Sequence, residues 1–492
     1  MKNLKAISLL LILCLVLCCC VQNNNKSNEQ SSAAADTTTE DSEISDGVTR
    51  LHDNVPAADY DGYTFTFLTR PNDDNGYWGH VEFYAEEQNA VPLNDAVYER
   101  NAKMEERFNI SFANICSHDW VNMMSKSVAS GDDIYDCVPL TVASAAAASV
   151  NGHLLAFSEL SNIDLSQPWW DPALNKQFSI ANKQHFAIGN ITLVDKEATY
   201  IIMFNKDVAR DFGVEDLYNI VDSGEWTIDR LMSISSGITS DIDGDGKYTY
   251  NDRVGFVTDT GATYQAMYYT GGARFFEKDD KDIPYFSVNM ERASGVIDKI
   301  IQITKSNDTM LAQTLIQQGI KNPWSDDGIN GMFKQGRALF YGISLTVMSK
   351  MRDMDSDFGV LPYPKYKEDD KEYISFVYSL ADSITIPKTC TDPDRTSAII
   401  EALCCESTYT TLPAYYDVTI TNKTIRDEAS AAQLEYIFAH RTMDMSITYN
   451  WGGLYEMLLS VKNGEGFASS LAKLEKSVKS ALDKTISVYL DN

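Results

Sequence analysis

The spacing of hydrophobic residues changes repeatedly between the two-residue period of a strand and the longer period of a helix. Residues 62–70 (GYTFTFLTR) alternate aromatic side chains with threonines, which predicts a strand. In the segment PLNDAVYERNAKMEERFNISF, the helical spacing of Val97, Asn101, Met104 and Phe108 predicts a helix, and residues 110–112 predict a second strand. This alternation predicts an α/β fold, with a mostly parallel sheet covered by helices.

The alternation continues through the middle of the chain. The segment EATYIIMFNKDVARDFG predicts a strand that runs into a short helix ending at Gly213. Thr227 is the predicted N-cap of the next helix, because its hydroxyl can accept a hydrogen bond from a free N–H of the first turn. From Asp392 onward the pattern predicts an almost wholly helical C-terminal region.

Residues 1–20 have the pattern of a targeting segment. Two lysines precede an apolar run of about twelve residues, AISLLLILCLVL, which suits a signal peptide and is shorter than the roughly 20 residues of a membrane-spanning helix. The run stops at three consecutive cysteines, and the polar stretch that follows predicts a disordered tether over residues 21–56. This arrangement resembles a bacterial lipoprotein signal and implies a lipid anchor on Cys20. Lipidation of Cys19 and a secretory signal cut elsewhere are the alternatives.

Residues 241–252 (DIDGDGKYTYND) have the pattern of a twelve-residue calcium loop. Calcium takes six to eight oxygen ligands, which such loops supply from positions 1, 3, 5, 7, 9 and 12. These positions hold Asp241, Asp243, Asp245, the Lys247 carbonyl, Thr249 and Asp252. Gly246 stands at position 6, where the chain turns sharply. A solvated acidic turn is the alternative, and position 12 carries the shorter Asp instead of Glu.

The segment that follows this loop, RVGFVTD, has the pattern of a strand. A calcium sensor needs two flanking helices that change their mutual angle. We therefore predict a structural Ca²⁺ that stiffens its surroundings, and not a switch.

The composition limits the class of partner. A net charge of −29 argues against nucleic acid, because binding phosphates needs clustered Lys and Arg, and it favours solubility outside the cell. With 44% hydrophobic residues over 492 positions, the chain has enough apolar side chains for two domains. Five of the nine cysteines follow the signal segment, and their spacing matches neither a disulfide framework nor a metal site.

The sequence patterns of common hydrolases and nucleotide-binding enzymes are missing. The chain contains no H-E-x-x-H, no G-x-S-x-G and no phosphate-binding G-x-x-x-x-G-K, and its six histidines are scattered. With 70 acidic residues, no pair of carboxylates can be singled out as that of a glycosidase. We predict a protein that is not an enzyme, with a surface-anchored carbohydrate-active hydrolase as the alternative.

Six stretches resemble, in the same order, the extracellular solute-binding proteins of ATP-driven importers, in the sugar-binding group found as lipoproteins in Gram-positive bacteria. They are IIMFNKDVARDFG, SGEWTIDRLMSISSGITSDIDGDGKYTYNDRVGF, FKQGRALFYG, DFGVLPYPKYK, SITIPK and LPAYYDVTITNKTIRDEAS. The resemblance implies a two-lobed periplasmic-binding-protein-like fold (type II), with a hinge between the lobes and a helical C-terminal region. It also implies a monomer at the extracellular face of the cytoplasmic membrane, which binds a mono- or oligosaccharide and delivers it to ABC permease subunits.

Analogy with this family divides the chain between the lobes. Lobe 1 is expected to comprise residues 57–197 plus 342–400, and lobe 2 residues 198–341 plus 401–492. The calcium loop then falls inside lobe 2, outside the solute cleft.

A sugar site needs flat aromatic faces for stacking and polar side chains for directed hydrogen bonds. Loop position and strand ends select five candidates, because the ends of sheet strands are expected to face the cleft. These are Trp78, Asp74, Thr141, Trp324 and Ser344. The family resemblance adds Tyr264 and Trp451, at positions where its members stack a sugar. The alternatives are a loop anchored by Trp78 and a solvated acidic loop at Asp74.

Overall fold

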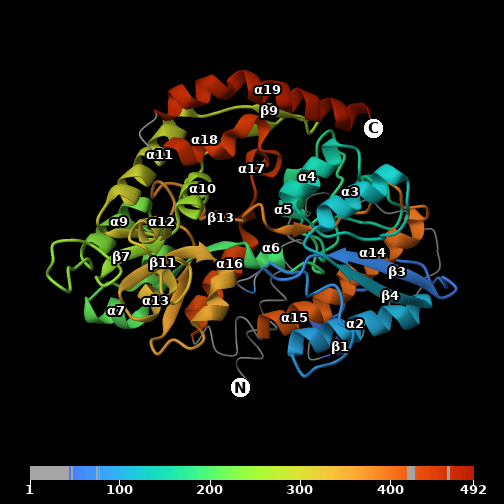
Figure 1. The fold of residues 1–492 in the computed structure, drawn as a ribbon, viewed down its shortest axis with the longest axis horizontal. Helices are drawn as coiled ribbons and strands as arrows, with labels where there is room; N and C mark the ends of the chain where they lie inside the picture. Colours follow the sequence, from blue (N-terminus) through green and yellow to red (C-terminus); the bar gives the residue numbers. More distant parts are fainter. Residues whose placement is uncertain are drawn as a thin grey trace, which may run out of the picture.

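The strands in the middle of the chain form one five-stranded sheet in the computed structural model of the protein (Figure 1). The order is β10 (Thr309–Leu311), β7 (Val254–Thr258), β11 (Ala338–Ser344), β6 (Tyr200–Asn205) and β12 (Phe358–Leu361). β6 is antiparallel to both of its neighbours, whereas the other pairs are parallel. The structure describes residues 44–45, 48–73, 76, 78–417, 427–461 and 466–491, so Cys20 and Asp74 lie outside the described residues.

Helices cover both faces of this sheet, so every residue of β6, β7 and β11 is buried. On one face, α9 (Ile228–Ser236), α10 (Thr260–Thr270) and α11 (Met290–Lys305) share a core cluster with Phe204 of β6. On the other face, α13 (Ile329–Lys334) shares a second cluster with Met203. Successive residues of a strand point to opposite faces, which explains how one short apolar run serves both clusters.

A second group of elements is built on β3 (Tyr63–Thr69), which pairs in parallel with β4 (Ile110–Cys116). The helix that connects them is α2 (Pro92–Phe108), as predicted, and Phe65, Met104 and Phe112 share its core cluster. The same group contains α3 (Trp120–Ser130), β5 (Leu140–Thr141), α4 (Val142–Val150) and β14 (Asp382–Ser383). We call this group lobe 1 and the group around the five-stranded sheet lobe 2.

Several of the other elements up to β15, together with η4, are short. They are β1 (Ile44–Ser45), β2 (Val48–Thr49), η1 (Phe157–Glu159), α5 (Pro172–Phe178), α6 (Val194–Glu197), α7 (Lys206–Asp211), α8 (Leu217–Asp222), β8 (Phe276–Lys278), β9 (Pro284–Phe286), α12 (Ala312–Gln317), η2 (Leu345–Met351), β13 (Ser375–Phe376), β15 (Arg441–Thr442) and η4 (Trp451–Gly453). Two local predictions are confirmed among the helices. Thr227 caps α9 by accepting the N–H of Arg230 at 3.2 Å, and Gly213 follows α7 with a φ of 65°.

Three segments lie in lobes other than those predicted. Residues 342–344 and 358–361 were expected in lobe 1, but they belong to β11 and β12, which both pair with β6 in lobe 2. Residues 401–416, expected in lobe 2, belong to α14 (Pro393–Tyr409) and α15 (Thr411–Tyr416), which pack against α2 of lobe 1. Strand pairing and helix packing determine the lobe to which each of these segments belongs. The order of elements along the chain does not predict it.

The C-terminal region is helical, as the sequence predicts, with α16 (Glu428–Ala439), α17 (Met445–Tyr449), α18 (Leu454–Val461) and α19 (Phe467–Asp491). Among the described residues, no helix combines the length and the apolar character that crossing a bilayer requires. Among the described residues, the free cysteines are Cys116, which is exposed, and Cys137, Cys390, Cys404 and Cys405, which are buried.

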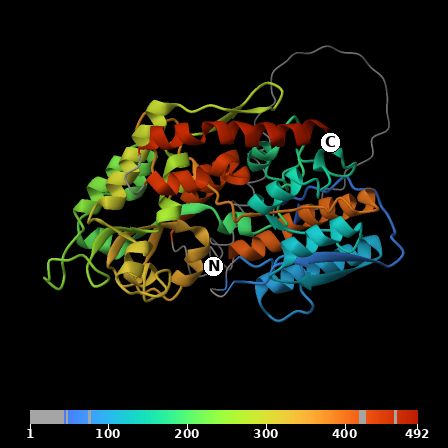
Figure 2. The ribbon, with the colours of Figure 1, turned by 45° about the horizontal axis from the view of Figure 1, so that its top comes forward.

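Helix α19 runs along one side of the molecule and bridges the two lobes (Figures 1 and 2). It packs against α18, and its last turn reaches α4 of lobe 1. There the buried Tyr489 hydroxyl lies 3.1 Å from Ser149 Oγ and 2.7 Å from the Tyr449 hydroxyl. The Tyr489 ring also contacts His185, with centroids 4.6 Å apart. α19 is therefore a strap between the lobes.

Removal of this contact is expected to lower stability. Tyr489→Phe leaves the hydroxyls of Ser149 and Tyr449 without their shared partner, at a cost of about 1–2 kcal/mol in the free energy of unfolding. Tyr489→Ala adds a cavity and is expected to cost about 3–5 kcal/mol. Urea unfolding measures both values. Leu490→Ala is the matched control, because Leu490 is 60% exposed, and it is expected to change stability by less than about 0.5 kcal/mol. Equal losses of stability at positions 489 and 490 would contradict the conclusion that the Tyr489 contact joins the two lobes.

Candidate solute site

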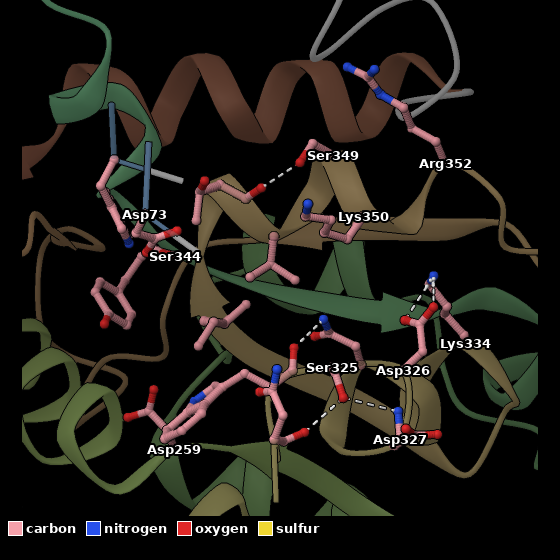
Figure 3. Close-up of a pocket in the computed structure, with 18 of the residues that line it drawn as sticks. Asp73, Asp259, Ser325, Asp326, Asp327, Lys334, Ser344, Ser349, Lys350 and Arg352 are labelled. Carbon is pink, nitrogen blue, oxygen red and sulfur yellow. Dashed lines mark hydrogen bonds and ion pairs between the residues drawn. The ribbon is translucent and has the colours of Figure 1, made fainter. Parts of the chain in front are cut away.

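A cavity of about 850 Å³ lies where lobe 1 meets lobe 2 (Figure 3). Asp73 and Trp78 line it from the loop that follows β3 in lobe 1. Lobe 2 contributes Asp259 after β7, residues of β11 and η2, and the loop that leads into α13. β7 and β11 are parallel neighbours, so their carboxyl ends open at the same edge of the sheet, where ligands of α/β proteins commonly bind.

Trp324 is the most exposed aromatic side chain in the cavity wall, at 42% of its surface. Its loop is held closely by hydrogen bonds, including one from the Asn330 side-chain amide to the Trp324 carbonyl at 2.5 Å. Gly328 is required here, because a Cβ at this position would lie 2.0 Å from the Pro323 carbonyl oxygen. The indole is thus presented to the cavity by a well-fixed loop.

Trp78 lines the cavity from lobe 1 and is half-buried. Its φ of 62° is in the left-handed region, which bulky residues rarely adopt, so the surrounding loop imposes this conformation. The two predicted tryptophans therefore come from different lobes and line the same cavity.

Charged side chains occupy the part of the wall nearest α13. Lys334 Nζ lies 3.0 Å from Asp326 and 2.8 Å from Asp353. Burial acts to lower the pKa of Lys334, and the hydrogen bonds with Asp353 and Asp326 outweigh it, so that the pKa is raised. The Lys334 ammonium in turn holds the pKa of Asp353 below its usual value. Lys350 and Arg352 add two more basic groups to this wall.

The floor of the cavity is built from strand ends. Ser344 closes β11 and is paired in register with Tyr200, the first residue of β6. Tyr200, Tyr378 and Asp259 line the cavity beside it. Burial is the main cause that raises the pKa of the Tyr200 phenol, with the charge of Asp259 as the next cause, so this phenol is neutral at physiological pH.

Within the described residues, three of the predicted ligand contacts line the cavity: Trp78, Trp324 and Ser344. Thr141 does not line it, and its hydroxyl caps α4 by accepting the N–H of Ser144 at 3.2 Å. Tyr264 is fully buried and its hydroxyl lies 3.2 Å from Thr304 of α11. Trp451 is 3% exposed, and its indole N–H donates to Thr485 at 2.8 Å. Tyr264 and Trp451 lie in the core of lobe 2 because their helices turn these faces inward.

Sequence reasoning did not select Asp259, Tyr200, Tyr378 or the basic residues of the cavity. A usable signal existed for Asp259, which is the last residue of the predicted strand RVGFVTD and is therefore at a strand end. Tyr200 and Tyr378 carry no such signal, because both lie in apolar segments where aromatic side chains are usually core.

The loop 241–252 joins α9 to β7, as the predicted helix-to-strand context requires. Asp241, Asp243 and Asp252 each offer a carboxylate oxygen, and these oxygens lie within 4.8 Å of one another. Asp241 also accepts the N–H groups of Gly244 and Gly246 at 2.7 and 2.8 Å. A set of carboxylate oxygens at this spacing fits the ligand preference of calcium.

Comparison with known proteins defines the family. The family model for bacterial extracellular solute-binding proteins matches residues 97–439. The chain belongs to this family. The members of this family are extracellular binding proteins and not enzymes. A search of curated proteins gives no match.

Solved structures with the same fold have little sequence identity to this solute-binding protein. The sugar-binding protein MalE from Xanthomonas citri has a TM-score of 0.56 and 12% identity, over 87% of this chain and 100% of that chain. UgpB from Mycobacterium tuberculosis, in complex with glycerophosphocholine, has a TM-score of 0.55 and 14% identity, over 86% and 99%. Lmo0181 from Listeria monocytogenes, in complex with cycloalternan, has a TM-score of 0.51 and 12% identity, over 86% and 98%. The predicted two-lobed fold is confirmed.

Proposed function

We propose that this solute-binding protein captures a carbohydrate in the cavity between its lobes and delivers it to the permease of an ABC importer. The observation that carries this proposal is the position of Trp78 and Trp324, which line one cavity from opposite lobes. Flat indole faces stack on the C–H patches of a sugar ring, and the aspartates and Ser344 of the same wall can bind its hydroxyls.

The position of the cavity supports a closing motion. A ligand that touches both lobes favours the closed state by its differential affinity for that state, and by no more than this amount. The volume of about 850 Å³ is in the upper part of the range for ligand sites, about 300–1,000 Å³, and suits a ligand larger than one sugar ring. Closed protein is then the form that the membrane subunits receive.

Calorimetric titration tests the proposal with mono- and oligosaccharides of one to six units. Saturable binding of one oligosaccharide per protein, with a rise in melting temperature and recovery of the sugar unchanged, is the expected result. Shortened products would instead indicate a hydrolase. Failure of every sugar in the panel, together with binding of peptides or polyamines, would reject the carbohydrate assignment.

The proposal also includes a lipid anchor and a monomeric state. We infer that Cys20 carries a lipid and holds a monomeric protein at the extracellular face of the cytoplasmic membrane. Cys20→Ala is expected to move the protein from the membrane fraction to the medium, whereas the single change Cys19→Ala leaves it attached. Loss of attachment in Cys19→Ala alone would assign the lipid to Cys19.

A structural calcium ion is proposed for the loop 241–252, held by Asp241, Asp243, Asp245, the Lys247 carbonyl and Asp252. Saturating calcium at 100 times its dissociation constant would stabilise the fold by about 2.7 kcal/mol, so chelation is expected to lower the melting temperature by about 5 °C. Sugar stoichiometry should not change. Asp243→Asn is expected to abolish the response to chelator. Sugar binding that falls in proportion to calcium removal, with the fold intact, would place calcium in the solute site instead.

A further inference from the structure

The backbone beside Trp78 is held by a buried histidine. Directly after β3, the Arg70 N–H donates to Nδ1 of His80 at 3.0 Å, and the His80 N–H donates to the Arg70 carbonyl at 3.0 Å. The Gly79 N–H donates to Oδ1 of Asn72 at 3.1 Å, and a Cβ at Gly79 would lie 2.1 Å from the same oxygen, so only glycine fits there. These bonds fix the chain directly after Trp78, which lines the cavity.

The bond from Arg70 determines the tautomer of the His80 ring. A backbone N–H can only donate, so Nδ1 has a free electron pair and the proton of the neutral imidazole is on Nε2. Nε2 lies 2.8 Å from Oδ2 of Asp382, which also accepts from Nη2 of Arg70 at 3.0 Å. The side chains of His80 and Asp382 are fully buried. The His80 ring is therefore in contact with protein groups and not with solvent.

His80 also connects Trp78 to a second part of the cavity wall. Asp382 begins β14, and Tyr378 and Leu380 in the segment that leads into this strand line the cavity. Asp382 is itself held in place, because β14 pairs with β5. His80 is not among the residues that line the cavity. It therefore joins two parts of the wall from behind, without reaching the space that a solute would occupy.

We propose that His80 is a positioning residue of the solute site: by accepting the Arg70 N–H, it holds Trp78 in the orientation in which its indole stacks on the solute. This inference rests on the proposed function, because stacking on a sugar is the role given there to Trp78. A wall that is already ordered before binding loses less conformational freedom when the solute arrives, and the affinity is higher by that difference.

Two substitutions separate the contacts of His80. An Asn side chain places its amide oxygen near the position of Nδ1, whereas a Gln side chain places its amide near that of Nε2. His80→Asn thus keeps an acceptor for the Arg70 N–H, and His80→Gln keeps only the contact with Asp382.

Calorimetry with the tightest sugar of the panel measures the consequence. His80→Gln and His80→Ala are expected to bind about tenfold more weakly than the unmodified protein, and His80→Asn to remain within about twofold of it. Retained affinity in His80→Gln together with a loss in His80→Asn would overturn the proposal. The Asn and Gln variants keep a polar side chain at this position, and they decide the matter if His80→Ala does not fold.

A double-mutant cycle tests whether His80 acts through Trp78. In a Trp78→Ala background, His80→Gln is expected to weaken binding by less than about twofold, because the indole that it positions is absent. An effect of His80 on the fold as a whole would instead weaken binding about tenfold in both backgrounds, and this result would overturn the proposal.

Asn175→Ala is the matched control. The side chain of Asn175 is buried on α5, outside the cavity, and it accepts the Ile188 N–H at 2.8 Å and donates to the Ile188 carbonyl at 2.9 Å. Its removal is expected to lower stability and to leave the affinity for sugar unchanged. An equal loss of affinity in Asn175→Ala and His80→Gln would show that destabilisation alone weakens binding, and would overturn the positioning role.

A measurement without solute separates this inference from the proposed function. In protein labelled with fluorotryptophan, the fluorine resonance of Trp78 is the one that is absent from Trp78→Phe. His80→Gln is expected to shift or broaden this resonance and to leave that of Trp324, in the opposite lobe, unchanged. An unchanged Trp78 resonance overturns the positioning role even if the protein binds sugar. A changed resonance in a protein that binds no sugar supports the positioning role and rejects only the carbohydrate assignment.

Discussion

Trp324→Ala is expected to weaken sugar binding by about 30-fold, equivalent to about 2 kcal/mol, while leaving the melting temperature nearly unchanged. The side chain is 42% exposed in the free protein, so its removal leaves no empty space in the core. What is lost is the flat face against which a sugar ring can stack. Calorimetry with the tightest sugar of the panel measures the loss, and circular dichroism checks the fold.

The matched control is Tyr285→Ala. Tyr285 is a comparably exposed aromatic residue, at 44%, on β9 of lobe 2 and outside the cavity. The Tyr285→Ala variant should bind sugar with the affinity of the unmodified protein. If Trp324→Ala also binds normally, the ligand does not stack on this wall, and the cavity would need to be assigned to another class of solute.

Trp78→Ala is expected to reduce affinity to a similar degree and to reduce stability as well. Trp78 is half-buried and packs against the core cluster of lobe 1. The two effects separate if affinity is measured well below the unfolding temperature.

Glu401→Ala is expected to lower the free energy of unfolding by about 3–5 kcal/mol. The indole N–H groups of Trp169 and Trp170 donate to the two oxygens of Glu401 at 2.8 and 2.9 Å. Both indoles are 1% exposed, so their donors cannot turn to water once the carboxylate is removed. Urea denaturation measures the change.

The control for this substitution is Glu475→Ala on α19. Glu475 forms an exposed ion pair with Lys479, one helical turn away, and pairs of this kind contribute at most about 0.5 kcal/mol. A loss below about 1 kcal/mol in Glu401→Ala would show that the two indoles find other partners, and that the Trp169–Trp170 turn does not depend on the carboxylate.

Glu401 also predicts a dependence of stability on pH. Burial raises its pKa to about 7, above the usual value of 4.5. Because the folded protein binds the proton more tightly than the unfolded chain, the contribution of Glu401 to stability is complete below about pH 4.5 and is lost as the pH rises through 7. Glu401→Gln removes the titration and should flatten this part of the stability profile. If Glu401→Gln has the same dependence of stability on pH as the unmodified protein, the raised pKa of Glu401 would be contradicted.

The local pattern of the sequence was sufficient for elements whose neighbours in space are also neighbours in the chain. Aromatic–threonine alternation predicted β3, helical spacing predicted α2, and Thr227 predicted the start of α9. The run RVGFVTD predicted β7, and with it the helix-to-strand setting of the acidic loop. In each case the periodicity of a single segment reports which of its faces is buried.

The local pattern of the sequence could not predict which segments lie next to one another in the fold. The apolar run of β12 is compatible with either lobe, and only its hydrogen bonds with β6 assign it to lobe 2. Tyr264 and Trp451 are at positions where the family resemblance implied sugar stacking, but their helices pack these faces into the core. Helix register and packing angle decide such a case, and neither is encoded in the local spacing of residues.

The sequence by itself determined the class of the protein, the elements of its lobes and the tryptophans Trp78 and Trp324 as sugar-stacking candidates. Only the tertiary structure brought those two tryptophans to one cavity and added Asp259, Tyr200 and Tyr378 to its lining. The physical reason is that burial and secondary structure depend on local periodicity, whereas a binding site depends on distances between segments more than a hundred residues apart.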